Sequence, residues 1–236
     1  HFHPGSRAYS VATPGCNFRC RWCQNCELSQ LVRDETLEVA REASPESIVD
    51  SAEQTDCRSI AYTYTEPTVF FEYSQDIAAC ARERGLSNIY VTNGYMTEQM
   101  LDLAESWLDA AAVDLKAFRD TTYRKYMGTR LQPVLDSLKR MKGNGIWVEI
   151  TTLIIPEVND SDEELGELVE FIVDELGADT PWHVSRFFPA YRMTGVPPTP
   201  PETLYRARDL GRDAGLRYVY IGNLAEETPT CCPDCG

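Results

Sequence analysis

Three cysteines stand close together near the start of this 236-residue chain. Cys16, Cys20 and Cys23 are separated by three and by two residues, and Trp22 directly precedes the third. Thiols at such short spacing suit an iron–sulfur cluster, whose irons are held by cysteine thiolates. Three protein ligands for four irons leave one iron open, and an open iron can bind a substrate or cofactor. The spacing therefore indicates chemistry at a cluster.

Other cysteines leave alternatives open. Cys20, Cys23 and Cys26 also spell Cys-x2-Cys-x2-Cys, the run of bacterial ferredoxins, so an iron–sulfur electron carrier is the competing hypothesis. A ferredoxin would be far shorter, and we interpret Cys26 as a buried or cluster-adjacent thiol. A structural zinc site would favour paired Cys-x2-Cys units. Such a half-site occurs at the other end, where Cys232 and Cys235 predict a second, zinc or iron site completed from outside the chain, or an unmetallated tail.

Polar residues follow the predicted strands. Glu66 comes after a predicted strand at 59–64, and Asn93 closes another at 88–92. Asp114 and Lys116 end the predicted strand at 110–115, where the two-residue period puts them on one face. That pair is predicted to bind ribose hydroxyls and a carboxylate, or to form a structural ion pair. Asn93 either binds a cofactor or caps a turn, and Glu66 alone would be a strand-end carboxylate in solvent.

Apolar, β-branched segments alternate with segments of helical period along the chain. The predicted strands cover 8–13, 59–64, 88–92, 110–115, 146–153, 182–185 and 218–221. Strand then helix, repeated about six times, predicts an α/β fold with a parallel sheet. A complete eight-unit barrel takes about 250 residues, so we expect a partial (β/α)6 TIM-like barrel, open laterally. We predict a barrel core at 1–224, a tail at 225–236, and a long loop at 189–201.

Composition narrows the class of protein. A formal charge of -15 argues against nucleic acid and anionic membranes as general partners. No apolar run of about 18 residues predicts a membrane span, and no leader for export is found, which favours the cytoplasm. Nine cysteines in tight groups indicate metal ligation in a reducing compartment. The chain starts at His1 without Met, and we expect it to be a fragment of a longer polypeptide.

The motifs together resemble a known family. Cys16-x3-Cys20-x-Trp22-Cys23 resembles the signature of radical S-adenosylmethionine (SAM) enzymes. The resemblance implies a [4Fe-4S] cluster whose open iron is chelated by the methionyl amino and carboxylate groups of SAM. It also implies that an electron from the cluster breaks a carbon–sulfur bond of SAM to give a 5′-deoxyadenosyl radical, with Trp22 against the adenine.

The same resemblance assigns further residues to SAM. Thr63-Tyr64-Thr65-Glu66-Pro67 is similar to the family's Gly-Gly-Glu-Pro motif, which implies contacts from Thr65 and Glu66 to the methionyl ammonium. Because Tyr64 and Thr65 replace glycines, the backbone should approach less freely. The Asp-Leu-Lys of glycyl-radical-enzyme activases implies SAM contacts from Asp114, Leu115 and Lys116. Asn93, Thr151 and Tyr191 lie in segments similar to further SAM-binding positions, whereas Glu149 stands where those activases have an arginine.

Over the whole chain, the motif order is most similar to the radical SAM enzymes of the AmmeMemoRadiSam system, relatives of pyruvate formate-lyase-activating enzyme. This implies partners of the Memo and AMMECR types, besides a flavodoxin-type or ferredoxin-type electron donor. Our leading hypothesis is an enzyme that cleaves SAM reductively and abstracts hydrogen from a substrate that the sequence does not identify. A glycyl-radical-enzyme activase is the narrower alternative.

Overall fold

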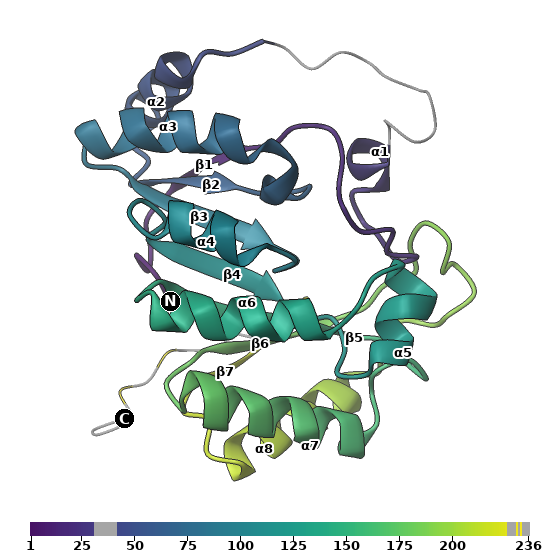
Figure 1. The fold of residues 1–236 in the computed structure, drawn as a ribbon. Helices are drawn as coiled ribbons and strands as arrows, with labels where there is room; N and C mark the ends of the chain where they lie inside the picture. The colour runs from purple at the N-terminus through teal and green to yellow at the C-terminus, as the bar shows by residue number, and fades with distance from the viewer. Residues whose placement is uncertain (31–41, 226–229, 231, 233–236) are drawn as a thin grey trace. The chain divides into compact units, whose positions relative to one another are not determined.

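Strands and helices alternate along the chain in the computed structural model, which describes residues 1–30, 42–225, 230 and 232 (Figure 1). The strands are β1 (Ala8–Val11), β2 (Ser59–Tyr62), β3 (Ser87–Thr92), β4 (Ala110–Asp114), β5 (Trp147–Ile154), β6 (Trp182–Arg186) and β7 (Val219–Gly222). The α-helices are α1 (Cys26–Ser29), α2 (Pro45–Gln54), α3 (Phe71–Glu83), α4 (Glu98–Ala104), α5 (Asp120–Thr122), α6 (Gln132–Gly143), α7 (Asp162–Phe171) and α8 (Pro201–Asp213). A 3-10 turn, η2 (Pro67–Phe70), precedes α3, and π-helical turns η3 (Tyr123–Met127) and η4 (Ile172–Leu176) continue α5 and α7.

The strands form an open parallel sheet. Its strand order is β1-β2-β3-β4-β5-β6-β7, so each strand lies beside its neighbour in the sequence. Parallel registers include Ala8 opposite Ser59 and Trp182 opposite Val219. The predicted α/β class with a laterally open parallel sheet is confirmed. The described residues hold seven strands, each at a predicted position, where we expected about six repeats.

The chain divides into two compact units. The first contains His1–Arg19, Cys23–Val113 and Pro133–Val148, and the second contains Cys20–Trp22, Asp114–Gln132 and Glu149–Gly236. In the first unit α2 packs on α3 and on β1 and β2, and α3 packs on β3. The aromatic rings of Tyr62, Tyr90 and Trp107 fill its core, with centroids 5.4 Å apart for Tyr62 and Tyr90 and 5.7 Å apart for Tyr90 and Trp107. Burial of these large rings stabilises the strands that end at the candidate site.

In the second unit, α8 lies on β6 and β7 and also contacts α7. The fully buried ring of Trp182 fills the space between α8 and the sheet. A Cβ added at Gly211 of α8 would lie 3.0 Å from Trp182 Cε3 and 3.1 Å from Val219 Cγ2. Glycine is therefore required there for the close approach of helix and sheet.

Helix starts were mostly predictable. Ser44, Thr97 and Ser161 each accept a hydrogen bond from the backbone N–H three residues on, as their position before a helical segment indicates. Thr121, whose residue type also suggests a cap, is not one: Arg119 is the N-cap of α5, and Thr121 lies inside the helix. Asp120, the first residue of α5, accepts hydrogen bonds from Arg124 Nε and from the Leu131 N–H.

Strand β5 shows how the sheet presents polar groups. Val148, Ile150, Thr152 and Ile154 are buried on one face, whereas Glu149 and Thr151 alternate with them on the other, half-buried face. The two-residue period of a strand produces this separation, so the polar face is available for chemistry.

Little of the predicted tail at 225–236 is described. Only Ala225, Thr230 and Cys232 belong to the described residues, and Cys232 is exposed. Cys231 and Cys235 lie outside them, so the second metal site stays a prediction. Throughout the described chain, every helix is too short or too polar to traverse a lipid bilayer.

Two glycines of the second unit give opposite expectations for substitution by alanine. Gly166→Ala in α7 meets no atom within 4 Å and should raise the free energy of unfolding by roughly 0.5–1 kcal/mol, because alanine loses less backbone entropy. Gly211→Ala should lower it by about 1–3 kcal/mol, because the new Cβ presses on the buried Trp182 ring. Urea denaturation of the apoprotein measures both. Equal shifts for the two variants would contradict the packing described for α8.

Candidate functional site

The cysteine segment is an irregular stretch between β1 and α1. Cys20 is buried, and Cys16 and Cys23 are half-buried. The Gly15 N–H donates to the Leu28 carbonyl, and the Gln30 side chain donates to the Phe18 carbonyl at 3.3 Å. These bonds fold the stretch back on itself and hold Cys16 and Cys23 within one loop of the first unit.

The sulfur of Cys16 lies among N–H donors. The Phe18 backbone N–H is 3.4 Å from Cys16 Sγ, and Asn93 Nδ2 is 3.8 Å from it. Asn93 Nδ2 also donates to Asn17 Oδ1 at 2.7 Å, and Asn17 Nδ2 donates to the Tyr95 carbonyl. Such donors favour the thiolate over the thiol and would stabilise a metal-bound sulfur. The end of β3 is thereby tied to the cysteine loop.

Asn17 was not among the predicted site residues. Its only sequence signal is its place directly after Cys16. Asn25 was missed as well, and its Nδ2 donates to the Tyr64 carbonyl at 2.9 Å. An asparagine next to closely spaced cysteines in the sequence could therefore have predicted a side chain that hydrogen-bonds to the cysteine loop or to a neighbouring segment.

Glu66 is buried at the end of β2, with 1% of its surface exposed. Its Oε1 accepts bonds from Thr68 N–H, Thr68 Oγ1 and Thr92 Oγ1 at 3.2, 2.6 and 2.7 Å, and its Oε2 accepts from the Asn93 N–H at 2.8 Å. The carboxylate is therefore not in solvent. Burial raises the pKa of Glu66, and the bonds from Asn93 and Thr68 act in the opposite direction. Four donors around one carboxyl group leave little acceptor capacity, most of it on Oε2.

Tyr64 holds a conformation that glycine normally occupies. Its φ is +63°, and its side chain is 56% exposed. The left-handed region is unfavourable for a residue with a Cβ, so the backbone at Tyr64 is strained. The next residue, Thr65, is half-buried and donates from Oγ1 to the Thr13 carbonyl at 2.8 Å, which joins the ends of β2 and β1.

In the second unit, Asp114 and Lys116 form the predicted pair. Lys116 Nζ lies 2.6 Å from Asp114 Oδ2. Burial alone would lower the pKa of Lys116, but the charges of Asp114 and Cys20 raise it above its usual value. Lys116 is thus a permanent cation beside Cys20, which favours a thiolate there. The buried Tyr123 hydroxyl accepts the Lys116 N–H at 3.2 Å and fixes this segment.

The other residues of this unit that were predicted to contact SAM differ in how far their side chains are exposed. The Leu115 side chain is fully buried, and its carbonyl accepts Thr152 Oγ1 at 3.0 Å. Trp22 is 4% exposed and lies beside Tyr126, with ring centroids 6.0 Å apart. Thr151 is half-buried on the polar face of β5. Tyr191 is half-buried at φ +51°, with the Arg192 guanidinium 4.9 Å from its ring centroid.

Cys23 and Cys26 differ in their surroundings. Cys23 Sγ lies 3.2 Å from Ser29 Oγ. Cys26 begins α1 and is half-buried, so of the two predicted roles the buried thiol is wrong, and the cluster-adjacent thiol stays a prediction. Residues Cys23 and Cys26 are both within the loop braced by Gly15 and Leu28.

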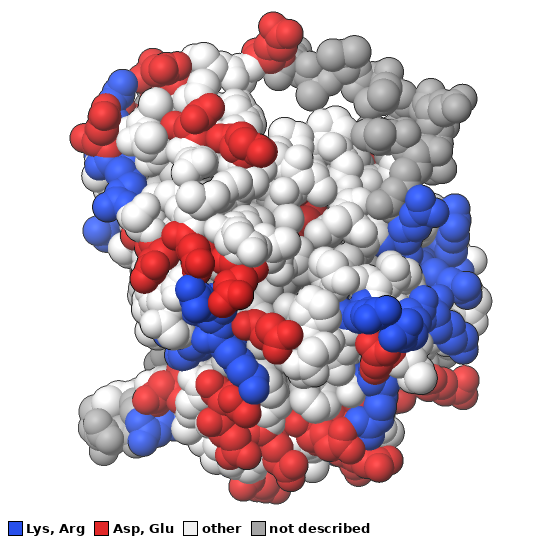
Figure 2. Space-filling model, in the orientation of Figure 1, with Lys and Arg blue, Asp and Glu red and all other residues white. Residues whose placement is uncertain are grey.

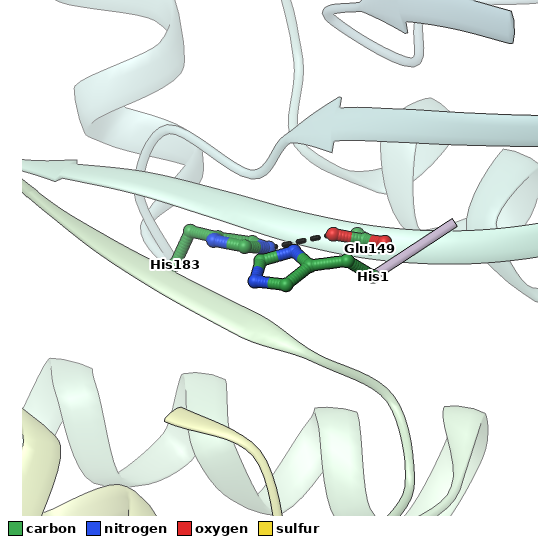
Figure 3. Close-up of side chains that lie close together, drawn as sticks. All are labelled: His1, Glu149 and His183. Carbon is green, nitrogen blue, oxygen red and sulfur yellow. Dashed lines mark hydrogen bonds and ion pairs between the residues drawn. The ribbon is translucent and has the colours of Figure 1, made fainter. Parts of the chain in front are cut away.

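Glu149, which stands where an arginine was expected, has a partner in the second unit. Its Oε2 lies 2.7 Å from His183 Nε2, and the two side chains point toward one another from β5 and β6 (Figure 3). The His183 ring stacks on Tyr220 with centroids 5.2 Å apart. An acid at position 149 thus serves an interaction inside the sheet. Sequence reasoning missed His183, although its position in β6 on the half-buried face was a signal.

The donors around the sulfur atoms suit thiolate ligands. Cys16 faces N–H donors, Cys23 faces a hydroxyl, and Cys20 faces the Lys116 cation. Cysteine thiolates accepting such contacts are the ligands of iron–sulfur clusters, and these contacts tune their potential. The surroundings of Cys16 and Cys23 in the first unit, and those of Cys20 in the second, therefore each fit a thiolate ligand of a cluster.

Comparison with known proteins gives a consistent result. The family model of the radical SAM superfamily matches residues 10–172. An uncharacterized protein of Methanocaldococcus jannaschii is 47% identical over 238 residues, which cover 100% of this chain and 70% of that protein. The pyruvate formate-lyase 1-activating enzyme of Escherichia coli is 21% identical over 231 residues, with 92% of this chain and 93% of the enzyme covered.

Solved structures share the fold. The crystal structure of a radical SAM methyltransferase from Sphaerobacter thermophilus superposes with a TM-score of 0.72 at 17% identity, covering 93% of this chain and 67% of that one. At this identity the likeness shows the fold alone.

The strain at Tyr64 predicts an unusual order of stabilities. Tyr64→Gly should be more stable than Tyr64→Ala by about 1 kcal/mol, because only glycine adopts φ +63° without steric cost. At the exposed Leu103 of α4 the order should reverse, since glycine weakens a helix by about 1 kcal/mol relative to alanine. Urea midpoints of the four variants measure both differences. The same order at both positions would exclude strain at Tyr64.

Proposed function

This chain belongs to the radical SAM superfamily, and we propose that it is an enzyme that cleaves SAM reductively at a [4Fe-4S] cluster and abstracts hydrogen from a substrate. Cys16, Cys20 and Cys23 are the proposed ligands of three irons. When bound, the cluster and SAM supply the electron and the radical chemistry. The chain's own residues hold the cluster, orient SAM and exclude water.

One observation carries this proposal. A hydrogen-bond path leads from Cys16 Sγ to Asn93 Nδ2 and from the Asn93 backbone N–H to Glu66 Oε2. The path joins a proposed cluster ligand to the carboxylate that the family resemblance assigns to the methionyl ammonium. A ligand that bridged the open iron and Glu66 would therefore meet a preorganised set of groups in the first unit.

The remaining SAM contacts are proposed by role. In the first unit the proposed SAM contacts are Thr65, Glu66 and Asn93. In the second unit the Asp114 carboxylate, which is 38% exposed, is the group suited to ribose hydroxyls, and the Lys116 ammonium is suited to the methionyl carboxylate. Trp22, Leu115, Thr151 and Tyr191 complete the proposed set, with Leu115 limited to its backbone because its side chain is fully buried.

Narrower features are proposals from sequence similarity. We propose membership of the AmmeMemoRadiSam group, with partners of the Memo and AMMECR types, an electron donor of the flavodoxin or ferredoxin type, and a place in the cytoplasm. Cys232 and Cys235 stay a predicted second zinc or iron site. A reductant is the one partner that the superfamily's chemistry requires.

Anaerobic reconstitution tests the main proposal. The reduced protein should show an EPR signal that changes on adding SAM, and chromatography should detect 5′-deoxyadenosine. Cys20→Ala should lose both the cluster and the product, because one of three ligands is removed. An iron-loaded protein whose signal ignores SAM would contradict the proposal and favour an electron carrier.

Two further cysteine variants serve as controls. Cys26→Ala, in the same loop, should keep the cluster and product formation, since Cys26 is not a proposed ligand. Cys80→Ala changes a half-buried thiol of α3 outside this loop and should do the same. Loss of the cluster in Cys26→Ala but not in Cys80→Ala would identify Cys26 as a fourth ligand, which would leave no iron free to bind SAM.

A glycyl-radical-enzyme activase is the second candidate, favoured by the similarity to the Escherichia coli activating enzyme over 92% of this chain. The reduced protein with SAM should then produce the doublet EPR signal of a glycyl radical on a co-purifying glycyl radical enzyme. The Cys20→Ala protein is the matched control and should give no doublet. Deoxyadenosine formation without a doublet on any such enzyme would exclude the activase while leaving SAM cleavage intact.

A further inference from the structure

Four exposed cations of the second unit lie around α5 and the cysteine segment. We call Arg21, Lys125, Arg130 and Arg192 the cationic surface. Figure 2 shows Lys and Arg side chains gathered around α5, whereas acidic side chains predominate over much of the same view. Among the described residues, none of the four forms an ion pair with an acid.

Tyr126 and the chain backbone hold three of these cations together. The Arg21 guanidinium and the Lys125 ammonium lie over the same Tyr126 ring, 5.7 and 4.7 Å from its centroid. The Arg21 N–H donates to the Tyr126 carbonyl at 3.1 Å, and the Arg192 N–H donates to the Arg21 carbonyl at 2.9 Å. The cysteine segment, η3 and the 189–201 loop are thus joined at this surface.

The cationic surface is unusual in a chain with this net charge. The chain has 37 acidic and 22 basic residues, so acidic partners are abundant. Like charges held together without an ion pair repel one another, and this repulsion is only partly offset by Asp120, which interacts with Arg130 at longer range. An anionic partner that docks here would remove that repulsion and would be steered to it during diffusional encounter.

The position of Arg21 indicates what the partner delivers. Arg21 is exposed and follows directly after Cys20, a proposed cluster ligand that is 8% exposed. A partner on the cationic surface would therefore be one residue from a cluster ligand without touching the cluster. An electron can cross protein between a docked partner and a cluster, whereas a substrate that gives up a hydrogen atom must contact the reacting atoms. This surface suits an electron donor and not a substrate.

We infer that the cationic surface formed by Arg21, Lys125, Arg130 and Arg192 is the docking site of a small acidic ferredoxin that reduces the cluster. The inference rests on the proposed function. We choose a ferredoxin because iron–sulfur clusters extend to the very low potentials that suit reductive cleavage of SAM. One electron leaves the reduced ferredoxin, which is oxidised, and enters the cluster held by Cys16, Cys20 and Cys23, which is reduced. No proton or group moves in this step.

The test uses the reconstituted chain and a reduced acidic two-cluster bacterial-type ferredoxin as the probe. Stopped-flow absorbance follows cluster reduction in the wild type and in the double variant Lys125→Glu/Arg192→Glu. At low ionic strength the second-order rate constant should fall about tenfold or more in the variant, because electrostatic steering is reversed. At about 0.5 M salt the two proteins should converge, because the charges are screened.

A matched double variant controls for net charge. Arg82→Glu/Arg212→Glu makes the same change in charge at exposed arginines on α3 and α8. It should retain a rate within about twofold of the wild type, because steering depends on the charge near the docking site. Equal slowing in both double variants, or no slowing in Lys125→Glu/Arg192→Glu, would overturn the inference.

A small chemical reductant separates this inference from the proposed function. With dithionite, the wild type and both double variants should form deoxyadenosine at the same rate. If no variant forms deoxyadenosine with dithionite, the proposed function fails; if all do and the ferredoxin rates ignore the surface, only the docking inference fails. Binding of polyuridylate to the wild type but not to Lys125→Glu/Arg192→Glu, with ferredoxin rates unchanged, would assign the surface to nucleic acid and overturn the inference.

Discussion

The buried carboxylate of Glu66 is the interaction on which the first unit's site depends. A carboxylate that is 1% exposed is costly unless donors surround it, and here the donors come from Thr68, Thr92 and Asn93. Satisfying Glu66 therefore fixes the ends of β2 and β3 relative to one another. Because Asn93 also donates to Cys16 Sγ, the same constraint reaches the cysteine loop. Polar networks of this kind are rigid when every member is satisfied, which is what a site for a reactive species requires.

Two distortions accompany that rigidity. Tyr64 holds a left-handed backbone conformation, and Tyr191 does so in the second unit. Such strain persists only where surrounding contacts determine the conformation, and Tyr64 is held by the bond from Asn25 to its carbonyl. Tyr64 thus holds a backbone conformation typical of glycine while its side chain is exposed.

The second unit carries two kinds of cation, one paired with an acid inside the protein and the other exposed. In the second unit Lys116 is paired with Asp114 and stays protonated beside Cys20, whereas the exposed cations of the surface around Arg21 form no ion pair within the described part of the chain. The paired cation favours a thiolate inside the protein, and the unpaired ones attract an anionic partner from outside. A strongly acidic chain thus carries a local positive surface next to Cys20, a proposed ligand of the cluster that would receive an electron.

Local sequence determined the cysteine spacing, the seven strands and the caps at Ser44, Thr97 and Ser161, because strand period, capping and ligand spacing act over a few residues. It also placed Asp114 and Lys116 on one face, where they do pair. Only the tertiary structure decided that Thr92 and Asn93 donate to Glu66, that the Asn93 side chain reaches Asn17 and Cys16, and that Glu149 meets His183. These contacts join residues tens of positions apart, so they depend on how the strands and loops pack and not on any local pattern.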